Sequence, residues 1–317
     1  MTVTMSVDDD RSHADHRVNG LLAITPARNE GEHLGRLITA MTAMTRRPDR
    51  WVIVDDGSSD HTGALACAAS AAHDWIVCER TDGSERRADW SKARRVNSVV
   101  ARHAGPDTDV IVVFDADIEP PADYLEHVAT AFATDATLGV FGGVCNYPDH
   151  LPVETEAFPA DIVPGGAAAI RTRTWHDIDG FWELPHGGLD VAACLAAQMR
   201  GWTTRNDHDL VCLHHRRMGT AEGRSPLRSL HRRGREDHDL GAALWFEIGK
   251  ALRRLHRGPI VLGSAALMSG YLRARITRAP HTPPPEFVAY VRSRGRRRTL
   301  APITRALRRY RRSKPVA

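Results

Sequence analysis

Short apolar runs that stop at polar or acidic residues recur through the first half of the chain. Residues 21–25, 51–54 and 112–114 form such runs, and each is followed at once by turn-forming or charged residues. Runs of this length and composition are typical of buried strands. The pattern therefore predicts strands that end where solvent begins.

An amphipathic helix is predicted between the first two runs. There, apolar side chains recur at spacings of three and four, at Leu34, Leu37, Ile38, Met41 and Met44. The order strand, helix, strand is the unit of a parallel sheet, so we expect an α/β fold.

Two carboxylates separated by one small residue follow the third run, at Asp115, Ala116 and Asp117. Because alternate side chains of a strand point to the same side, the pair can hold a divalent cation that also binds phosphate. Taken alone, such a pair is more often turn chemistry or a helix cap.

A second acidic run, Asp-Asp-Gly-Ser-Ser-Asp, occupies residues 55–60. Gly57 lets the backbone turn without a Cβ clash, and an aspartate just past a strand can accept a bond from a base N–H. The alternative is that Asp55 and Asp56 cap a helix beginning near Thr62, which Ser59 or Asp60 could do instead. Both interpretations of Asp55 and Asp56, base contact and helix cap, therefore remain open.

Residues 26–30, the 55–60 run and the 115–117 motif together resemble, in order and spacing, the nucleotide-sugar half of the family 2 glycosyltransferases. The resemblance implies a GT-A fold, which is a Rossmann-like mixed sheet flanked by helices, a nucleoside-diphosphate sugar donor, and Mg²⁺ or Mn²⁺. In that family the second aspartate of the run contacts the base, and the Asp-x-Asp pair meets the ribose and the metal. The implied donor-binding residues are Pro26, Ala27, Arg28, Glu30, Asp56, Lys92, Asp115, Ala116 and Asp117.

Lys92 belongs to a further motif that is similar to one in the family. Ser91-Lys92-Ala93, with Asn97 after it, resembles the Gly-Lys-Ala and following Asn of the family. The resemblance puts Lys92 at a helix start facing the diphosphate, where a cation compensates phosphate charge. The alternative is a solvated lysine in a polar loop.

The second half of the chain resembles the acceptor half of the same family. A glycine-rich stretch contains Gly165 and Gly166, a Gly-Phe pair follows at 180–181, and Leu189-Asp190 precedes Trp202 by the usual helix. The resemblance makes Asp190 the catalytic base and assigns Gly165, Gly166 and Leu189 to the acceptor site. Leu189 departs from the family, which has a glutamate there. Asp190 could instead cap the helix that follows, or do both.

A histidine pair, His214 and His215, ends the next apolar run. Several relatives have a histidine at about this distance as a third protein ligand, and spacing selects His215. His214 is the second choice, because neighbouring strand residues face opposite ways. The implied metal ligands are thus Asp115, Asp117 and His215. A lone histidine after a strand is usually a surface residue.

Charge is strongly asymmetric along the chain. Residues 251–317 contain 17 Lys and Arg against one acidic residue, Glu286, a net charge of +16, so a total of +4 leaves −12 for the rest. Two basic amphipathic helices are predicted there, one with Leu244, Trp245, Ile248, Leu252 and Leu255, the other with Leu300, Ile303, Leu307 and Tyr310. Residues 259–272 carry no charge, but are too few for a bilayer that requires about 20.

Three alternatives remain for this basic region: an anionic membrane surface, nucleic acid, or packing against the acidic domain. Nucleic acid is the least favoured, because no recognisable reader motif accompanies the arginines. A membrane surface would bring the enzyme to a lipid-linked acceptor.

The expected organisation is a disordered segment at 1–18, a catalytic domain at 19–222 and a basic helical extension at 223–317. The catalytic domain divides into a nucleotide-sugar half, 19–120, and an acceptor half, 121–222. Residues 1–18 lack the basic start and apolar core of a secretory signal, and the five cysteines are dispersed. We therefore expect reduced thiols and a cytoplasmic protein, peripheral on the inner face of the cytoplasmic membrane.

The expected reaction moves one sugar to an acceptor hydroxyl with inversion, in cell-envelope polysaccharide, glycolipid or secondary-metabolite glycosylation. Processive synthases of the wider family carry Gln-x-x-Arg-Trp, whereas residues 198–202 read Gln-Met-Arg-Gly-Trp. A retaining transferase and a nucleotidyltransferase are the enzymatic alternatives. An inactive membrane or nucleic-acid adaptor is the alternative from outside catalysis.

Overall fold

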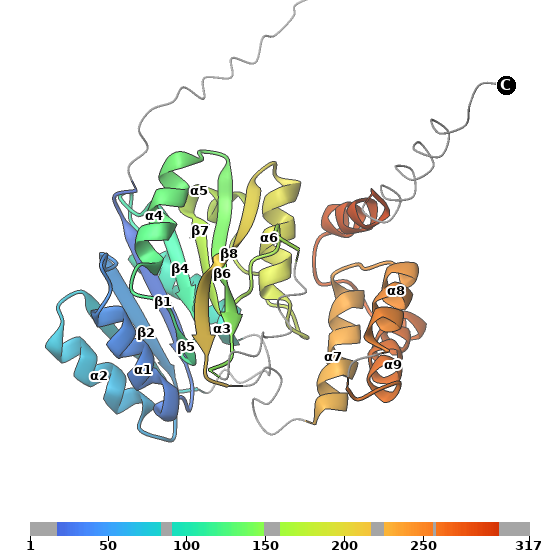
Figure 1. Cartoon of the computed structure of the whole chain (residues 1–317), viewed down its shortest axis with the longest axis horizontal. Helices are drawn as coiled ribbons and strands as arrows, with labels where there is room; N and C mark the ends of the chain where they lie inside the picture. Colours follow the sequence, from blue (N-terminus) through green and yellow to red (C-terminus); the bar gives the residue numbers. More distant parts are fainter. Residues whose placement is uncertain (1–17, 84–90, 149–158, 217–224, 256–257, 298–317) are drawn as a thin grey trace, which may run out of the picture.

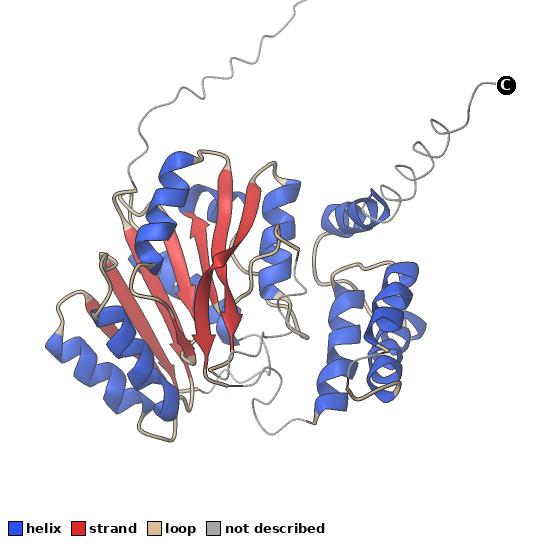
Figure 2. Cartoon of the chain, in the orientation of Figure 1, coloured by secondary structure: helices blue, strands red, loops and turns tan. Residues whose placement is uncertain are grey.

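The computed structural model describes residues 18–83, 91–148, 159–216, 225–255 and 258–297 (Figure 1). A single eight-stranded sheet forms its centre, with helices on both faces (Figure 2), and a group of helices from the C-terminal region lies beside it. The expected mixed α/β architecture is confirmed.

The sheet has the strand order β3-β2-β1-β4-β7-β6-β8-β5. The first four of these run parallel, β7 is antiparallel to both β4 and β6, and β5 is antiparallel to β8. The strands span Leu21–Ala27 (β1), Arg50–Asp56 (β2), Ile76–Thr81 (β3), Val110–Phe114 (β4), Ile118–Glu119 (β5), Leu138–Asn146 (β6), Ala167–Arg171 (β7) and Thr203–His214 (β8).

Both faces of the central strands are buried, which explains their nearly continuous apolar sequence. Ala23 of β1 packs with α1, α2 and α4, whereas its neighbour Ile24 packs with α3, α5 and α6. The helices span Gly31–Thr42 (α1), Thr62–Ala72 (α2), Ser91–His103 (α3), Tyr124–Thr134 (α4), Thr172–Asp177 (α5) and Leu189–Met199 (α6).

The predicted amphipathic helix is α1. Leu34, Leu37 and Met41 on one side of it are fully buried against the sheet, and Ile38 packs partly against the same core. The parallel strands β1, β2 and β4 end at the same edge of the sheet, where Ala27 pairs with Asp55. Ligands of open α/β sheets bind at this carboxyl edge.

The basic region folds into helices. These are α7 (Pro226–Asp239), α8 (Leu244–Arg254), α9 (Leu262–Ile276) and a further helix at 285–297. The predicted helix at Leu244 is α8, while the one predicted at Leu300 lies outside the described residues. The uncharged segment 259–272 largely becomes α9, and no helix of the described chain is long and apolar enough to cross a membrane.

Two glycines let α7 and α9 meet backbone to backbone. A Cβ on Gly234 would lie 2.0 Å from the Leu267 carbonyl oxygen, and one on Gly270 would lie 1.8 Å from that of His231. Any larger residue at either position would force the helices apart. The close packing makes α7 and α9 one unit.

This helical unit also packs on the acceptor half of the sheet domain. Phe287 is fully buried and contacts Trp182 edge to face, at 4.9 Å between ring centroids. Arg294 Nε donates to Gln198 Oε1 at 3.0 Å, and Arg232 Nε donates to the carbonyl of His186 at 2.9 Å. The packing alternative therefore holds for the described part of the basic region.

Glu247 of α8 provides a test of this packing. It is completely buried, and burial together with the nearby charge of Asp237 raises its pKa from 4.5 to about 8. Between those values the unfolded chain ionises first, so the free energy of unfolding falls as pH rises from about 4.5 to about 8. Glu247→Gln removes this loss and should raise the melting temperature at pH 8 while changing it little at pH 5.

Thermal melts at both pH values, with exposed Glu286→Gln as the matched control, check the expectation. A melting temperature lowered at pH 8 would show that the ionised carboxylate stabilises the fold.

Candidate active site

The side chains at the carboxyl edge of the sheet come from four strands and two helices. Asp56 ends β2, Asp115 follows β4, and Asp117 directly precedes β5. The backbone N–H of Asp115 donates to the carbonyl of Gly166 at 2.9 Å, which joins the donor and acceptor halves. The edge is therefore one continuous site.

Asp56 is buried at the end of β2, beside Thr81 of β3 and Arg95 of α3. Its Oδ1 accepts bonds from Thr81 Oγ1 at 2.7 Å and from Arg95 Nε at 2.9 Å. Among the described residues these bonds all go to Oδ1, so Oδ2 is the oxygen left for a ligand N–H. The arrangement suits a base-contacting carboxylate.

Asp55 has a different position and does not cap α2. It is fully buried, accepts from the Ser58 N–H at 2.9 Å and pairs with Arg80 Nε at 3.3 Å. Asp60 makes the capping bonds instead. Its carboxylate accepts from the N–H groups of Thr62 and Gly31, each at 3.0 Å. Asp55 and Asp56 thus do not cap this helix.

Lys92 sits in the first turn of α3 and reaches the site. Its Nζ forms an ion pair with Asp115 and donates to the Gly165 carbonyl at 3.0 Å. Burial alone would lower the pKa of Lys92, but the charge of Asp115 outweighs it and keeps the ammonium protonated. The geometry agrees with a lysine facing the site and not with one in a solvated loop.

Asp117 is buried and carries two partners. Arg216 donates to its Oδ2 from Nε at 2.8 Å and from Nη2 at 2.7 Å, and His214 Nε2 lies 3.3 Å from the same oxygen. Burial would raise the pKa of Asp117, but these partners hold it well below its usual range. The carboxylate is ionised at any physiological pH.

The two histidines face different carboxylates. His214 lies beside Asp117 and stacks on Tyr147, whereas His215 Nε2 lies 2.6 Å from Glu119 Oε2. Spacing favoured His215 as the third metal ligand, and the geometry puts His214 beside the Asp-x-Asp pair instead. The third-ligand role of either histidine stays a prediction.

Glu30 completes this cluster from the end of the β1 loop. Its Oε1 is paired with Arg216, its Oε2 is buried without a hydrogen-bond partner, and burial raises its pKa to about 7. An orphaned buried oxygen beside Asp117 is a feature that a bound cation would satisfy. Carboxylate oxygens and one imidazole suit Mg²⁺ or Mn²⁺.

No ready-made cluster of three metal-binding side chains occurs among the described residues. Arg216 and Lys92 supply the positive charge instead, since each is paired with one carboxylate of the Asp-x-Asp motif. In this structure the two carboxylates are thus compensated by protein cations, and the metal ligands Asp115, Asp117 and His215 stay predictions.

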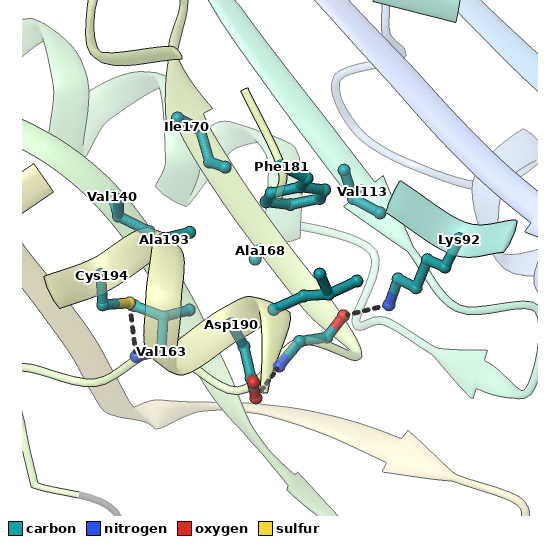
Figure 3. Close-up of a pocket in the computed structure, with 12 residues that line it drawn as sticks. Lys92, Val113, Val140, Val163, Ala168, Ile170, Phe181, Asp190, Ala193 and Cys194 are labelled. Carbon is teal, nitrogen blue, oxygen red and sulfur yellow. Dashed lines mark hydrogen bonds between the residues drawn. The ribbon is translucent and has the colours of Figure 1, made fainter. Parts of the chain in front are cut away.

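Asp190 lies in the first turn of α6, behind the acceptor loop (Figure 3). Its Oδ2 accepts from the Gly165 N–H at 3.1 Å, and its Oδ1 accepts from the Val191 N–H at 2.9 Å. Gly165 thus links Asp190 through its N–H to Lys92 through its carbonyl. The base and cap alternatives are both compatible with this position.

The glycines of the acceptor loop are required by close contacts. A Cβ on Gly166 would lie 2.9 Å from Ile118 Cδ1, and one on Gly165 would lie 3.2 Å from Asp190 Cβ. Leu189 lines a cavity of about 20 Å³, room for one water, which lies among apolar side chains beside Lys92 and Asp190 (Figure 3). Leu189 therefore contributes packing at this point.

Of the other predicted donor residues, Pro26 and Ala27 belong to the end of β1 and Ala116 is buried between the two aspartates. Arg28 lies in the loop between β1 and α1. Their predicted donor contacts remain predictions.

Sequence reasoning missed three charged residues of the site. Arg95 lies one helical turn after Lys92 on α3, a spacing that could have revealed it, and Arg216 directly follows the histidine pair. Glu236 of α7 gave no such signal: its carboxylate faces Gly187 and Gly188, just before Asp190, and burial raises its pKa to about 7. Only the folded chain brings it to the acceptor loop.

Comparison with known proteins agrees with this geometry. Residues 22–154 match the model of glycosyl transferase family 2. No curated protein sequence matches the chain. Residues 22–154 are therefore similar to glycosyl transferase family 2, and the chain has the GT-A fold of its structural neighbours.

Solved structures with the same fold include three transferases. The mannosyltransferase PcManGT of Pyrobaculum calidifontis, solved with GDP-Man and Mn²⁺, has a TM-score of 0.53 and 22% identity over 82% of this chain and 75% of that one. GalNAc-T7, solved with UDP, GalNAc and Mn²⁺, has a TM-score of 0.53 and 14% identity over 82% and 55%. TarS of S. aureus has a TM-score of 0.52 and 15% identity over 75% and 44%.

Asn97 of α3 holds the loop at Phe181 in place, and the loss of its two hydrogen bonds should be measurable. Its side chain donates to the Phe181 carbonyl at 2.8 Å and accepts from the Phe181 N–H at 3.0 Å. Asn97→Ala leaves both backbone groups unpaired, so the free energy of unfolding should fall by on the order of 1–3 kcal/mol. Chemical denaturation measures it.

Ser98→Ala is the control, because Ser98 Oγ only accepts a bond from exposed Arg102 on the same helix. Equal losses in the two variants would mean that the Asn97 bonds do not fix the loop.

Proposed function

We propose that this protein is a metal-dependent, inverting and non-processive glycosyltransferase that moves a sugar from a nucleoside-diphosphate sugar to an acceptor hydroxyl. The observation that carries the proposal is the bonded path from Asp115 through Lys92 and Gly165 to Asp190. This path connects Asp115, which is suited to bind the donor, with Asp190, which is suited to act on the acceptor.

Donor binding falls to residues at the edge of β1, β2 and β4. Asp56 accepts from the base through its remaining oxygen, while Arg95 and Thr81 hold the carboxylate in place. Asp115 takes the ribose, and Lys92 lies where its ammonium compensates the charge of the diphosphate. The family match over this half of the chain supports these roles.

Asp115 and Asp117 hold Mg²⁺ or Mn²⁺ in this proposal, and the metal neutralises charge on the leaving diphosphate when bound. His214 is the better candidate for a third ligand than His215, since it already lies beside Asp117. The unpaired oxygen of Glu30 points to the same demand for a cation. Structures of the same fold have been solved with Mn²⁺.

Asp190 acts as the general base that takes the proton from the acceptor hydroxyl. Its two N–H bonds from Gly165 and Val191 orient the carboxylate. Direct displacement on the face opposite the diphosphate then inverts the anomeric centre. Retention of configuration in the product would select the retaining alternative, and release of pyrophosphate would select a nucleotidyltransferase.

The acceptor in this proposal belongs to cell-envelope polysaccharide, glycolipid or secondary-metabolite glycosylation, and the enzyme works at the inner face of the cytoplasmic membrane. The basic helical region beside the acceptor half supports such a place. The processive Gln-x-x-Arg-Trp motif does not occur in the chain, so one sugar is transferred per encounter.

Asp117→Asn should abolish metal-dependent binding of a nucleoside diphosphate. The amide removes the charge that both the metal and Arg216 require, and Glu119 is already paired with His215. Calorimetry with GDP and UDP, with and without Mn²⁺, measures the effect, and exposed Asp123→Asn is the matched control. Unchanged Mn²⁺-dependent affinity in the Asp117 variant would exclude this metal assignment.

Asp190→Asn should keep donor affinity and lower turnover by about 10²- to 10⁴-fold, the range for loss of a positioned general base. The amide oxygen can still accept the Gly165 or Val191 bond, so the fold is retained. Release of nucleoside diphosphate from the preferred donor gives turnover. If turnover survives, Asp190 only orders α6, and Glu236 becomes the next candidate for the base.

A further inference from the structure

Large exposed apolar side chains gather in one part of the molecule. Within the described ranges, all those more than a third exposed lie between residues 227 and 276. Single exposed apolar side chains are ordinary, whereas a contiguous group indicates a binding surface. They are Leu227, Trp245, Phe246, Ile248, Leu252, Leu255, Ile260, Val261, Leu262, Leu272 and Ile276.

The helix α8 carries the most regular part of this group. Trp245, Ile248, Leu252 and Leu255 recur at spacings of three and four, whereas Glu247 on its other side is completely buried. The outer face of α8 is therefore apolar, the reverse of a helix whose outer side only meets water. The helix at 285–297 reaches one end of this face, where a Cβ on Gly295 would lie 3.4 Å from the Trp245 ring, but Ile248 and Leu252 stay 43% and 60% exposed.

The turn into α9 continues the apolar surface. Ile260, Val261 and Leu262 are exposed by 65%, 59% and 62% in succession. We call the outer face of α8 together with residues 260–262 the docking surface. Figure 1 shows α8 and α9 on the side of the helical unit away from the sheet, so the docking surface does not compete with the active site.

The stretch of chain that carries most of the docking surface is basic. Between residues 248 and 285 the chain has seven Lys and Arg and no Asp or Glu. Arg253, Arg273, Arg275 and Arg278 are exposed there, while Lys250 is paired with Asp237. An apolar helix face bordered by arginines is complementary to an anionic lipid headgroup layer above acyl chains.

We propose that the docking surface binds an anionic phospholipid bilayer, with its apolar side chains in the interface and the arginines at the headgroups. The contact is shallow, because no described helix could span the bilayer. Membrane binding by this surface requires neither donor nor metal. Its role in bringing the enzyme to an acceptor rests on the proposed function. Through it the helical unit brings the acceptor loop to a membrane.

The geometry of the helical unit supports that purpose. On its inner side, Arg232 of α7 bonds the His186 carbonyl and Leu240 shares the core of α6. The docking surface and the acceptor loop therefore sit on opposite sides of one packed unit. Attachment through the outer side therefore leaves the inner contacts with the sheet domain intact.

Truncation is a poor test, because it would also remove buried Phe287 and Leu240 from the core of the acceptor half. Point substitutions on the full chain avoid this problem. Leu252→Glu combined with Ile260→Glu places two charges on the docking surface, where both side chains are already mostly exposed. Thr39→Glu combined with Thr42→Glu on exposed positions of α1 is the matched control.

The experiment is co-sedimentation with vesicles of phosphatidylcholine, alone or mixed with phosphatidylglycerol, over a salt series. The native chain and the α1 control should bind the mixed vesicles at low salt, bind less as salt rises, and bind pure phosphatidylcholine weakly. The docking-surface variant should lose at least about tenfold in affinity, because a charge replaces each of two apolar side chains that would enter the interface. A blue shift of Trp245 emission, lost in Trp245→Phe, should accompany binding.

A native chain that stays in solution with the mixed vesicles at low salt overturns the proposal. So does a docking-surface variant that binds as well as the native chain, because attachment would then reside elsewhere. Dimerisation of the native chain that the variant abolishes, without vesicle binding, would assign the surface to a second copy of the chain. Calorimetry with nucleoside diphosphate and Mn²⁺ on the same variant should be unchanged, which separates failure of this proposal from failure of the proposed function.

Discussion

Buried carboxylates at the ends of parallel strands require compensating cations, and this constraint organises the active site. Asp115 is balanced by Lys92 of α3, and Asp117 by Arg216, which follows β8. Removing one partner of such a pair leaves an uncompensated charge in a partly buried place, which costs several kcal/mol. Because Arg216 lies about a hundred residues from Asp117, the donor site is complete only after β8 has joined the sheet.

The same network couples the two halves of the enzyme. Gly165 donates to Asp190 and accepts from Lys92, so the group suited to the acceptor and the cation suited to the diphosphate are held by one residue. A side chain at this residue would press on Asp190. The glycine-rich loop thus sets the distance between Asp190 and Lys92.

The C-terminal helices extend this arrangement outward. Their inner side, through Arg232, Glu236 and Phe287, contacts the acceptor half, and their outer side is apolar and bordered by arginines. The described part of this basic sequence is therefore a folded helical unit, with one face packed on the sheet domain and one exposed apolar face. The two faces lie on opposite sides of this unit, so the apolar face is turned away from the sheet domain.

The sequence by itself determined the strands at 21–25, 51–54 and 112–114 and the helices α1 and α8, because periodicity and turn residues are local signals. It did not determine that β7 enters antiparallel beside β4, or that Glu236 reaches the acceptor loop, since both depend on pairing between distant segments. The histidine pair shows the physical reason most directly. Register shifts between β6 and β8 break the strict alternation of side chains before His214, so only the tertiary structure could decide which imidazole faces Asp117.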